Sequence, residues 1–230
     1  MQRPETPPVL EVVRTGGRNL GAVRRFDDRV DAWFEPLRRN RFANRVFYLA
    51  SEGADFSIGW HLVSAGRALA RPEYEAAALR MAAALAVESG LVNGVLKQAV
   101  GRARPTPPEA PPHAIRRPKT SSFPSGHASS AVLAAALLSE RSALKPLWWS
   151  TAAIVAASRI HTRMHHASDV VAGAAIGGAL AVAVRRLVPL DLRFRPGWSP
   201  RSRPLPGRPG EPGRRAGDRS PQTLTRAAGR

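Results

Sequence analysis

The chain has 230 residues, and 35 Lys and Arg against 17 Asp and Glu give it a formal charge of +18. It contains no Cys, which excludes disulfides, zinc sites with Cys ligands and a Cys nucleophile. Apolar residues make up 43% of the chain, enough to bury a core, so wholesale disorder is not expected. The excess of positive charge predicts an anionic partner: nucleic acid, anionic lipid or a phosphorylated substrate.

Residues 1–41 are predicted to be a basic arm followed by an amphipathic helix. Residues 1–11 hold three Pro and two Glu where a signal peptide needs an apolar stretch, so none is expected. From Leu20 to Arg41, apolar residues recur at helical spacing between arginines; they are Val23, Phe26, Val30, Trp33, Phe34 and Leu37. Such a helix lies flat on a membrane or on a soluble bundle, and periodicity does not distinguish the two.

Residues 42–190 are predicted to form a helical domain, with apolar segments at 42–69, 74–96, 128–139, 147–158 and 170–184. The last is 15 residues without a polar side chain and ends at Arg185 and Arg186, as membrane helices often do. No segment reaches about 18 uninterrupted apolar residues, so hydropathy alone leaves a soluble and a membrane bundle open. Two GxxxG spacings, Gly90 to Gly94 and Gly173 to Gly177, permit close helix contact.

Two stretches are rich in proline. Residues 104–124 hold seven Pro in 21 and are predicted to be a loop, because Pro removes backbone donors and clashes with a helical turn. Residues 191–230 carry seven Pro, six Gly and ten Arg against three acidic residues, and are expected to be a disordered tail of charge +7. With no strand pattern and no internal repeat, the predicted fold class is all-α, a compact helical bundle.

Three blocks of residues, each where a helix begins or ends, carry the candidate chemistry: Lys97 to Pro105, Pro124 to His127, and Ser158 to Asp169. In the second block, Gly126 and the N-terminus of the following helix offer N–H groups to a phosphate. The cations Lys97, Arg104 and Arg159 can add charge-assisted hydrogen bonds. Taken alone, Pro-Ser-Gly-His is also consistent with an ordinary N-cap turn and a surface histidine.

In the third block, His165 and Asp169 are spaced i, i+4 and share a helix face. A carboxylate that accepts Nδ1–H would leave Nε2 exposed as a nucleophile or base. The alternative is a simple contact at a helix start. His161, His165 and Asp169 also form a stripe like a two-His, one-carboxylate metal site, but no HExxH glutamate accompanies it, and neither a metal nor a cofactor is predicted.

Together, Lys-x6-Arg-Pro, Pro-Ser-Gly-His and Ser-Arg-x5-His-x3-Asp resemble the three-part signature of the type 2 phosphatidic acid phosphatase (PAP2) family. Its superfamily includes bacterial acid phosphatases and vanadium haloperoxidases. The resemblance runs from about Lys97 to Val184. It implies a multi-pass protein of the cell membrane, with about five spanning helices and an interfacial N-terminal helix. The implied substrate is a lipid phosphate or diphosphate, of the phosphatidic acid or polyprenyl phosphate type.

The resemblance also implies a metal-independent mechanism. His165 attacks phosphorus and becomes a phosphohistidine, Asp169 orients it, and His127 protonates the leaving oxygen and then activates water. Charge on the phosphoryl oxygens is stabilised by a further set of residues: Lys97, Arg104, Ser125, Gly126 and Arg159.

The sequence is also compatible with other classes of protein. A soluble non-specific acid phosphatase of the same superfamily is the main alternative, although such enzymes are usually exported. A vanadium haloperoxidase has the same pocket but generally a much longer chain. The charge also fits a nucleic-acid-binding protein, but no recognised reader module is present, so no nucleic-acid partner is expected.

Overall fold

The computed structural model describes residues 17–106 and 117–190. The predicted arm before Gly17, the middle of the Pro-rich loop and the predicted tail from residue 191 lie outside these residues. The chain forms the following helices: α1 (Gly17–Arg38), α2 (Arg41–Gly53), η3 (Asp55–Ser57), α3 (Ile58–Ala70), η4 (Pro72–Tyr74), α4 (Glu75–Ser89), η5 (Gly90–Leu96), α5 (Lys97–Ala99), α6 (Gly126–Leu138), η6 (Ser139–Arg141), α7 (Lys145–His161) and α8 (Ala167–Leu187). No strand occurs in this part of the chain, and the predicted all-α class is confirmed.

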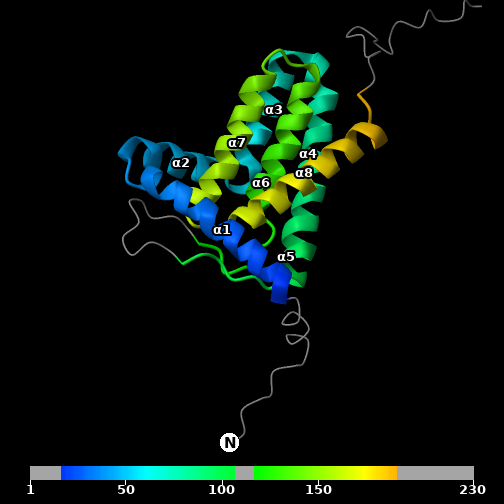
Figure 1. The fold of residues 1–230 in the computed structure, drawn as a ribbon. Helices are drawn as coiled ribbons and strands as arrows, with labels where there is room; N and C mark the ends of the chain where they lie inside the picture. The colour runs from blue at the N-terminus through cyan, green and yellow to red at the C-terminus, as the bar shows by residue number, and fades with distance from the viewer. Residues whose placement is uncertain (1–16, 107–116, 191–230) are drawn as a thin grey trace, which may run out of the picture. The chain divides into compact units, whose positions relative to one another are not determined.

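Helix α6 is the centre of the bundle (Figure 1). It packs chiefly against α8 and α7 and also contacts α4 and α3. Most of its residues are buried, and many of them are Ala or Ser. Small side chains let the neighbouring helices approach closely, so the first turn of α6 is fixed by packing on several sides.

The contact between α6 and α8 depends on two glycines. A Cβ atom on Gly173 would lie 2.3 Å from the carbonyl oxygen of Ser125, and one on Gly177 would lie 2.2 Å from that of Ser129. The Gly173–Gly177 spacing therefore forms the close helix contact that it permits. The Gly90–Gly94 spacing does not, because a Cβ at either position would meet no atom within 4 Å.

The apolar segment 42–69 is not one helix. It is divided into α2 and α3 by η3, and Ser57 takes a left-handed conformation with φ 57° at the junction. Helix α1 lies across the end of the bundle against α7 and α8. Its Val30 and Phe34 pack on the core, while Phe26 and Trp33 are exposed. The apolar residues of α1 therefore lie on two faces, one against the bundle and one on the surface.

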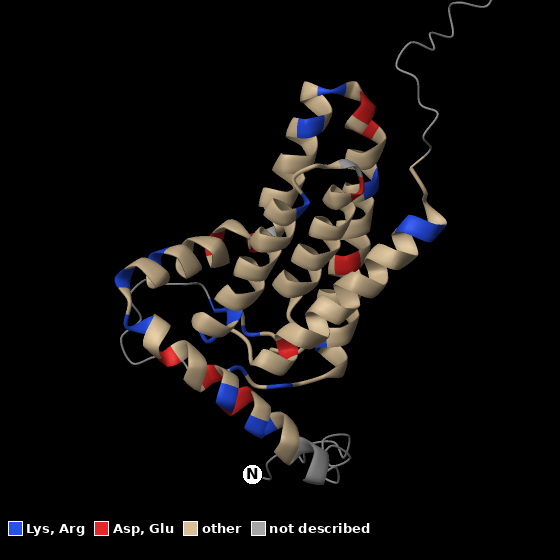
Figure 2. Ribbon diagram, turned by 45° about the horizontal axis from the view of Figure 1, so that its top comes forward, with Lys and Arg blue, Asp and Glu red and all other residues tan. Residues whose placement is uncertain are grey.

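Two helical segments, Pro72–Ala99 and Ala167–Leu187, are long and apolar enough to cross a membrane. Figure 2 shows charged residues gathered on α1 and at the ends of the bundle helices, whose middles carry few. The thirteen residues of α6 span only about 20 Å, less than the ~30 Å of a hydrocarbon core. The number of spanning helices therefore stays a prediction.

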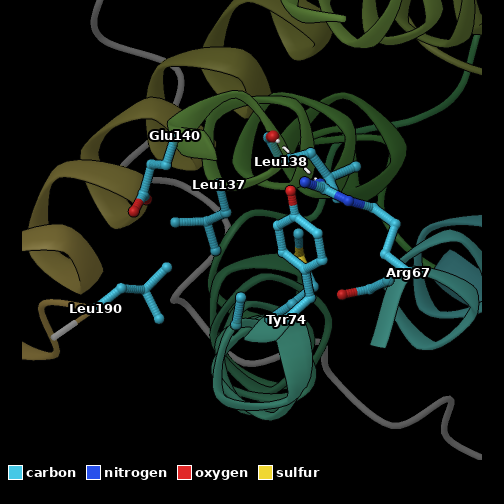
Figure 3. Close-up of a pocket in the computed structure, with 9 residues that line it drawn as sticks. Arg67, Tyr74, Leu137, Leu138, Glu140 and Leu190 are labelled. Atoms are coloured by element: carbon cyan, nitrogen blue, oxygen red, sulfur yellow. Dashed lines mark hydrogen bonds between the residues drawn. The ribbon is translucent and has the colours of Figure 1, made fainter. Parts of the chain in front are cut away.

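The end of the bundle where α3 and α6 finish is held by paired polar groups. Figure 3 shows a small cavity there, with the Arg67 side chain beside Tyr74 and Leu138. The Arg67 guanidinium lies 4.3 Å from the centre of the Tyr74 ring and donates a 3.3 Å hydrogen bond to the Leu138 carbonyl. Glu140 forms ion pairs with Arg80 at 2.6 Å and with Arg185 at 3.0 Å. These contacts tie α3, α4, α6 and α8 together away from the sequence blocks singled out above.

Candidate active site

A cavity with an empty volume of about 1390 Å³ opens at the other end of the bundle, where α6 begins and α7 ends. Six of the eight predicted site residues line it: Lys97, Arg104, Gly126, His127, Arg159 and His165. Ser125 and Asp169 are fully buried next to it. The three sequence blocks therefore meet in one place, although up to about 70 residues separate them.

His165 lies between α7 and α8 and is 3% exposed. Its Nδ1 is 2.6 Å from the carbonyl oxygen of Ser122. Because a carbonyl only accepts, Nδ1 carries the proton and Nε2 keeps its lone pair. The Arg104 guanidinium, which only donates, lies 3.3 Å from Nε2 and agrees with this tautomer. His165 is thus held with the lone pair of Nε2 beside a cation that can bind phosphate.

The surroundings of His165 keep its imidazole neutral. Burial, followed by the positive charges of Arg159, Arg104 and Lys97, lowers the pKa of His165 well below its ordinary value of 6.5. The hydrogen bond to Ser122 opposes this only in part. A neutral imidazole is the form that can attack phosphorus, so the cations that would bind phosphate also favour the form of His165 that a nucleophile requires.

The predicted hydrogen bond between His165 and Asp169 is not formed. The Asp169 carboxylate is 3.9 Å from His165 Nδ1, beyond hydrogen-bonding distance. It accepts instead from the backbone N–H of His166 at 2.9 Å and pairs with Arg102 at 2.5 Å. The i, i+4 spacing places the two side chains on one face as expected, but Ser122 supplies the acceptor that fixes the tautomer of His165.

Serine 125 and Gly126 form the N-terminus of α6 that faces the cavity. Ser125 is the N-cap and accepts a hydrogen bond from the Ala128 N–H, while its own N–H donates to the Asp169 carbonyl at 3.0 Å. The close contact with Gly173 presses α8 against the same residue. This packing positions the N–H groups of the first turn, which are the groups that bind anions at helix ends.

The three cations reach the cavity from different elements. Lys97 follows the π-helical segment η5 and donates a 2.7 Å hydrogen bond to Asn93, which also lines the cavity. Arg104 donates to the Met164 carbonyl at 2.8 Å. Arg159, on α7, is 2% exposed and bonded to Ser51 on α2. A dianionic phosphoryl group placed among them would meet positive charge on several sides.

Asp55 is a site residue that the sequence did not single out. It lies in η3 and accepts a 2.8 Å hydrogen bond from Nε2 of His127. Because a carboxylate only accepts, Nε2 carries the proton and Nδ1 is the atom that can exchange a proton with a substrate. The two residues are 72 positions apart, and Asp55 belongs to none of the three blocks, so only the folded chain brings them together.

Arg102 is a second residue that only the structure identifies. Its guanidinium bonds Asp169 at 2.5 Å, Ser168 at 2.7 Å and Asp27 of α1 at 2.7 Å. Asp27 is buried and also accepts from the Ser168 N–H at 2.8 Å. This network attaches α1 to the start of α8 and determines where Asp169 lies.

The suggested metal stripe of His161, His165 and Asp169 does not converge on one point. His161 Nε2 is 2.7 Å from the Asn44 side-chain oxygen, and its ring packs on Phe47 at a centroid distance of 4.5 Å. Over residues 17–106 and 117–190, no group of three His, Asp or Glu side chains is placed to hold a metal ion.

A family model described as the PAP2 superfamily matches residues 77–193. The chain belongs to the PAP2 superfamily. The matched range contains all three sequence blocks, all but the first two residues of α4, and α5 to α8, so the predicted resemblance is confirmed. With it, the predicted enzyme class is confirmed: the chain is a phosphatase of this superfamily.

The PAP2 fold is also found by structural comparison. The crystal structure of a transmembrane PAP2-type phosphatidylglycerolphosphate phosphatase from Bacillus subtilis superposes with a TM-score of 0.60. The two sequences are 24% identical, and the match covers 80% of this chain and 92% of the other. No curated protein gives a significant sequence match.

Proposed function

We propose that this PAP2 phosphatase hydrolyses a lipid phosphate or diphosphate, of the phosphatidic acid or polyprenyl phosphate type, through a phosphohistidine and without a metal ion. One observation carries the proposal: Nε2 of His165 faces a cavity that also holds Lys97, Arg104, Arg159 and the N-terminus of α6. A nucleophile with a fixed tautomer beside several phosphate-binding groups is the arrangement that in-line phosphoryl transfer needs.

In the first step, the Nε2 lone pair of His165 attacks phosphorus, and the bond from phosphorus to the leaving oxygen breaks. His127 enters this step as the imidazolium and gives its Nδ1 proton to that oxygen, so the product leaves as an alcohol or as a shorter phosphate and His127 becomes neutral. Asp55 acts as a positioning residue that holds His127 by its Nε2–H. Lys97, Arg104 and Arg159 offset the charge on the equatorial oxygens.

In the second step, neutral His127 takes a proton from a water molecule, whose oxygen attacks phosphorus. The bond from phosphorus to His165 Nε2 breaks, and phosphate is released. Between the steps, the phosphorylated imidazole keeps Nδ1–H on the Ser122 carbonyl. Asp169, 3.9 Å away, stabilises its positive charge through space rather than by a hydrogen bond.

The lipid character of the substrate is supported by the apolar exterior. The segments Pro72–Ala99 and Ala167–Leu187 have the length and composition of spanning helices, and Trp33 and Phe42 of α1 and α2 are about three-quarters exposed. Exposed aromatic residues beside arginines are typical of helices at a membrane surface. We propose that the protein is multi-pass, with α1 lying in the interface.

The test of the function is phosphate release by the purified protein from phosphatidic acid and polyprenyl phosphate in mixed micelles. We expect activity to survive EDTA and to be inhibited by vanadate, which imitates five-coordinate phosphorus. Full loss on chelation, restored by adding a divalent ion, contradicts the mechanism. Release of the protein from membranes by a salt wash alone favours the soluble acid phosphatase instead.

The pH dependence tests the state of His165. Because the low pKa keeps its imidazole neutral, kcat/KM for an aryl phosphate is expected to persist as the pH falls through 6.5 and to drop only well below that value. The measurement is a pH–rate profile over a range in which circular dichroism shows the protein to be folded. An acid limb at or above 6.5 would show that His165 is not the neutral nucleophile.

A further inference from the structure

A third cavity, with an empty volume of about 790 Å³, lies between α3 and α7. Its described lining carries no Lys, Arg, Asp, Glu or His. On α7, Thr151 donates its hydroxyl to the Leu147 carbonyl at 2.8 Å, and the Trp148 indole N–H donates to Ser142 at 2.9 Å. The polar atoms of these two side chains are therefore paired within the protein, and the groove offers a largely hydrocarbon surface.

This apolar groove adjoins the active-site cavity. Ala54 lines both. On one side of it, Gly53 lines the groove, and on the other, Asp55 lines the active site and holds His127. A methyl group is thus the side chain at the boundary between the phosphate site and the groove.

Helix α7 also passes from the active-site cavity to the apolar groove along its length. Arg159 lines the active site and Val155, one turn earlier on the same face, lines the groove. From Val155 the groove continues to Leu147, a distance of about 12 Å at the rise of an α-helix. A molecule with a charged phosphate at one end and a hydrocarbon chain at the other matches this sequence of surfaces.

We propose that the groove between α3 and α7 binds the hydrocarbon tail of the substrate whose phosphate occupies the active site. The proposal rests on the lipid phosphatase function and adds the place where the tail lies. Its consequence is that the groove governs discrimination by chain length and leaves the chemistry at phosphorus untouched. The shared lining at Ala54 favours the tail of the bound substrate over a bystander lipid or a second copy of the chain.

The experiment narrows the groove without touching the active-site cavity. A Cβ at Gly53 meets no atom within 4 Å, so Gly53→Leu can be accommodated and would project bulk at the groove. Ile154→Trp, at a partly exposed position that lines the groove, is the second variant. Gly66→Leu is the matched control, because Gly66 also has open space around its Cβ but lies on α3 outside both cavities.

The measurement is kcat/KM for dihexanoyl and dioleoyl phosphatidic acid at equal mole fraction in micelles, with an aryl phosphate as reference. We expect both groove variants to lower the long-chain to short-chain ratio by about tenfold, the loss equivalent to about two buried methylenes. Aryl phosphate hydrolysis should match the wild type, and Gly66→Leu should keep the wild-type ratio.

Other outcomes overturn the proposal in distinguishable ways. An unchanged ratio in both groove variants with normal aryl phosphatase activity shows that the tail lies elsewhere, and the phosphatase function stands. A further variant, Ala86→Leu, changes a residue of α4 that lines the active-site cavity. If this variant alone lowers the long-chain to short-chain ratio, the tail lies between α3 and α4. Absence of phosphate release from every substrate by the wild type refutes the function itself.

Discussion

Replacing His165 by alanine is expected to lower turnover by about 10³-fold or more and to abolish the phosphoenzyme. The side chain that is removed carries an imidazole nitrogen held next to Arg104 with its lone pair available to phosphorus. The cations and the N-terminus of α6 would remain and could still bind phosphate, so substrate affinity should change far less than turnover. The measurement is a rapid quench with labelled aryl phosphate, counting acid-labile, base-stable phosphate on the protein.

The control for this variant is the neighbouring histidine. His166 is the N-cap of α8 and bonds Asp169 at 3.2 Å, so it contributes to the structure and is not an inert position. His166→Asn retains a residue that caps helices well while removing the imidazole. We expect this variant to form the phosphoenzyme. If His165→Ala still traps phosphate and His166→Asn does not, the assignment of the nucleophile is wrong.

Replacing His127 by alanine is expected to separate the two steps of the reaction. A lipid alcohol is a poor leaving group that must be protonated as its bond to phosphorus breaks, whereas an aryl oxide leaves readily as an anion. Lipid phosphate hydrolysis should therefore fall by about 10² to 10⁴-fold, while an aryl phosphate still phosphorylates His165. The intermediate should then accumulate, because the same imidazole activates the hydrolytic water.

A companion variant, Asp55→Asn, tests how His127 is held. An amide oxygen can still accept the 2.8 Å hydrogen bond from Nε2, but the negative charge that favours the imidazolium is lost. The alkaline limb of lipid phosphate hydrolysis should move to lower pH, a change that general damage to the fold would not produce. If the alkaline limb of Asp55→Asn does not shift, His127 is not the acid and base of the reaction. The same conclusion follows if the phosphoenzyme does not accumulate in His127→Ala.

The sequence by itself determined the parts of this protein that depend on short-range spacing. The small, apolar run after Gly126 and the apolar run 170–184 predict α6 and α8, because helix formation depends on neighbouring residues. The Gly173–Gly177 spacing permits their close contact, but the equal spacing Gly90–Gly94 makes none, so spacing alone does not select the partner helix. The three blocks indicated the family and the residues of the active-site cavity. The apolar segment 42–69 is divided into two helices, and the break follows Gly53, where Glu52 and Asp55 interrupt the apolar pattern.

Only the tertiary structure decided which hydrogen-bonding partner each candidate catalytic side chain has. The i, i+4 spacing predicted that Asp169 is the hydrogen-bonding partner of His165. In the structure, His165 Nδ1–H donates instead to the carbonyl of Ser122, 43 positions away. The Asp169 carboxylate accepts hydrogen bonds from Arg102 and from the backbone N–H of His166. Every residue has a carbonyl, so such an acceptor leaves no trace in the sequence. Asp55 likewise reaches His127 because α2 ends where α6 begins. The residue types that the chemistry needs can thus be read from short stretches of sequence. Their tautomers and charges depend on distant groups that packing brings within hydrogen-bonding distance.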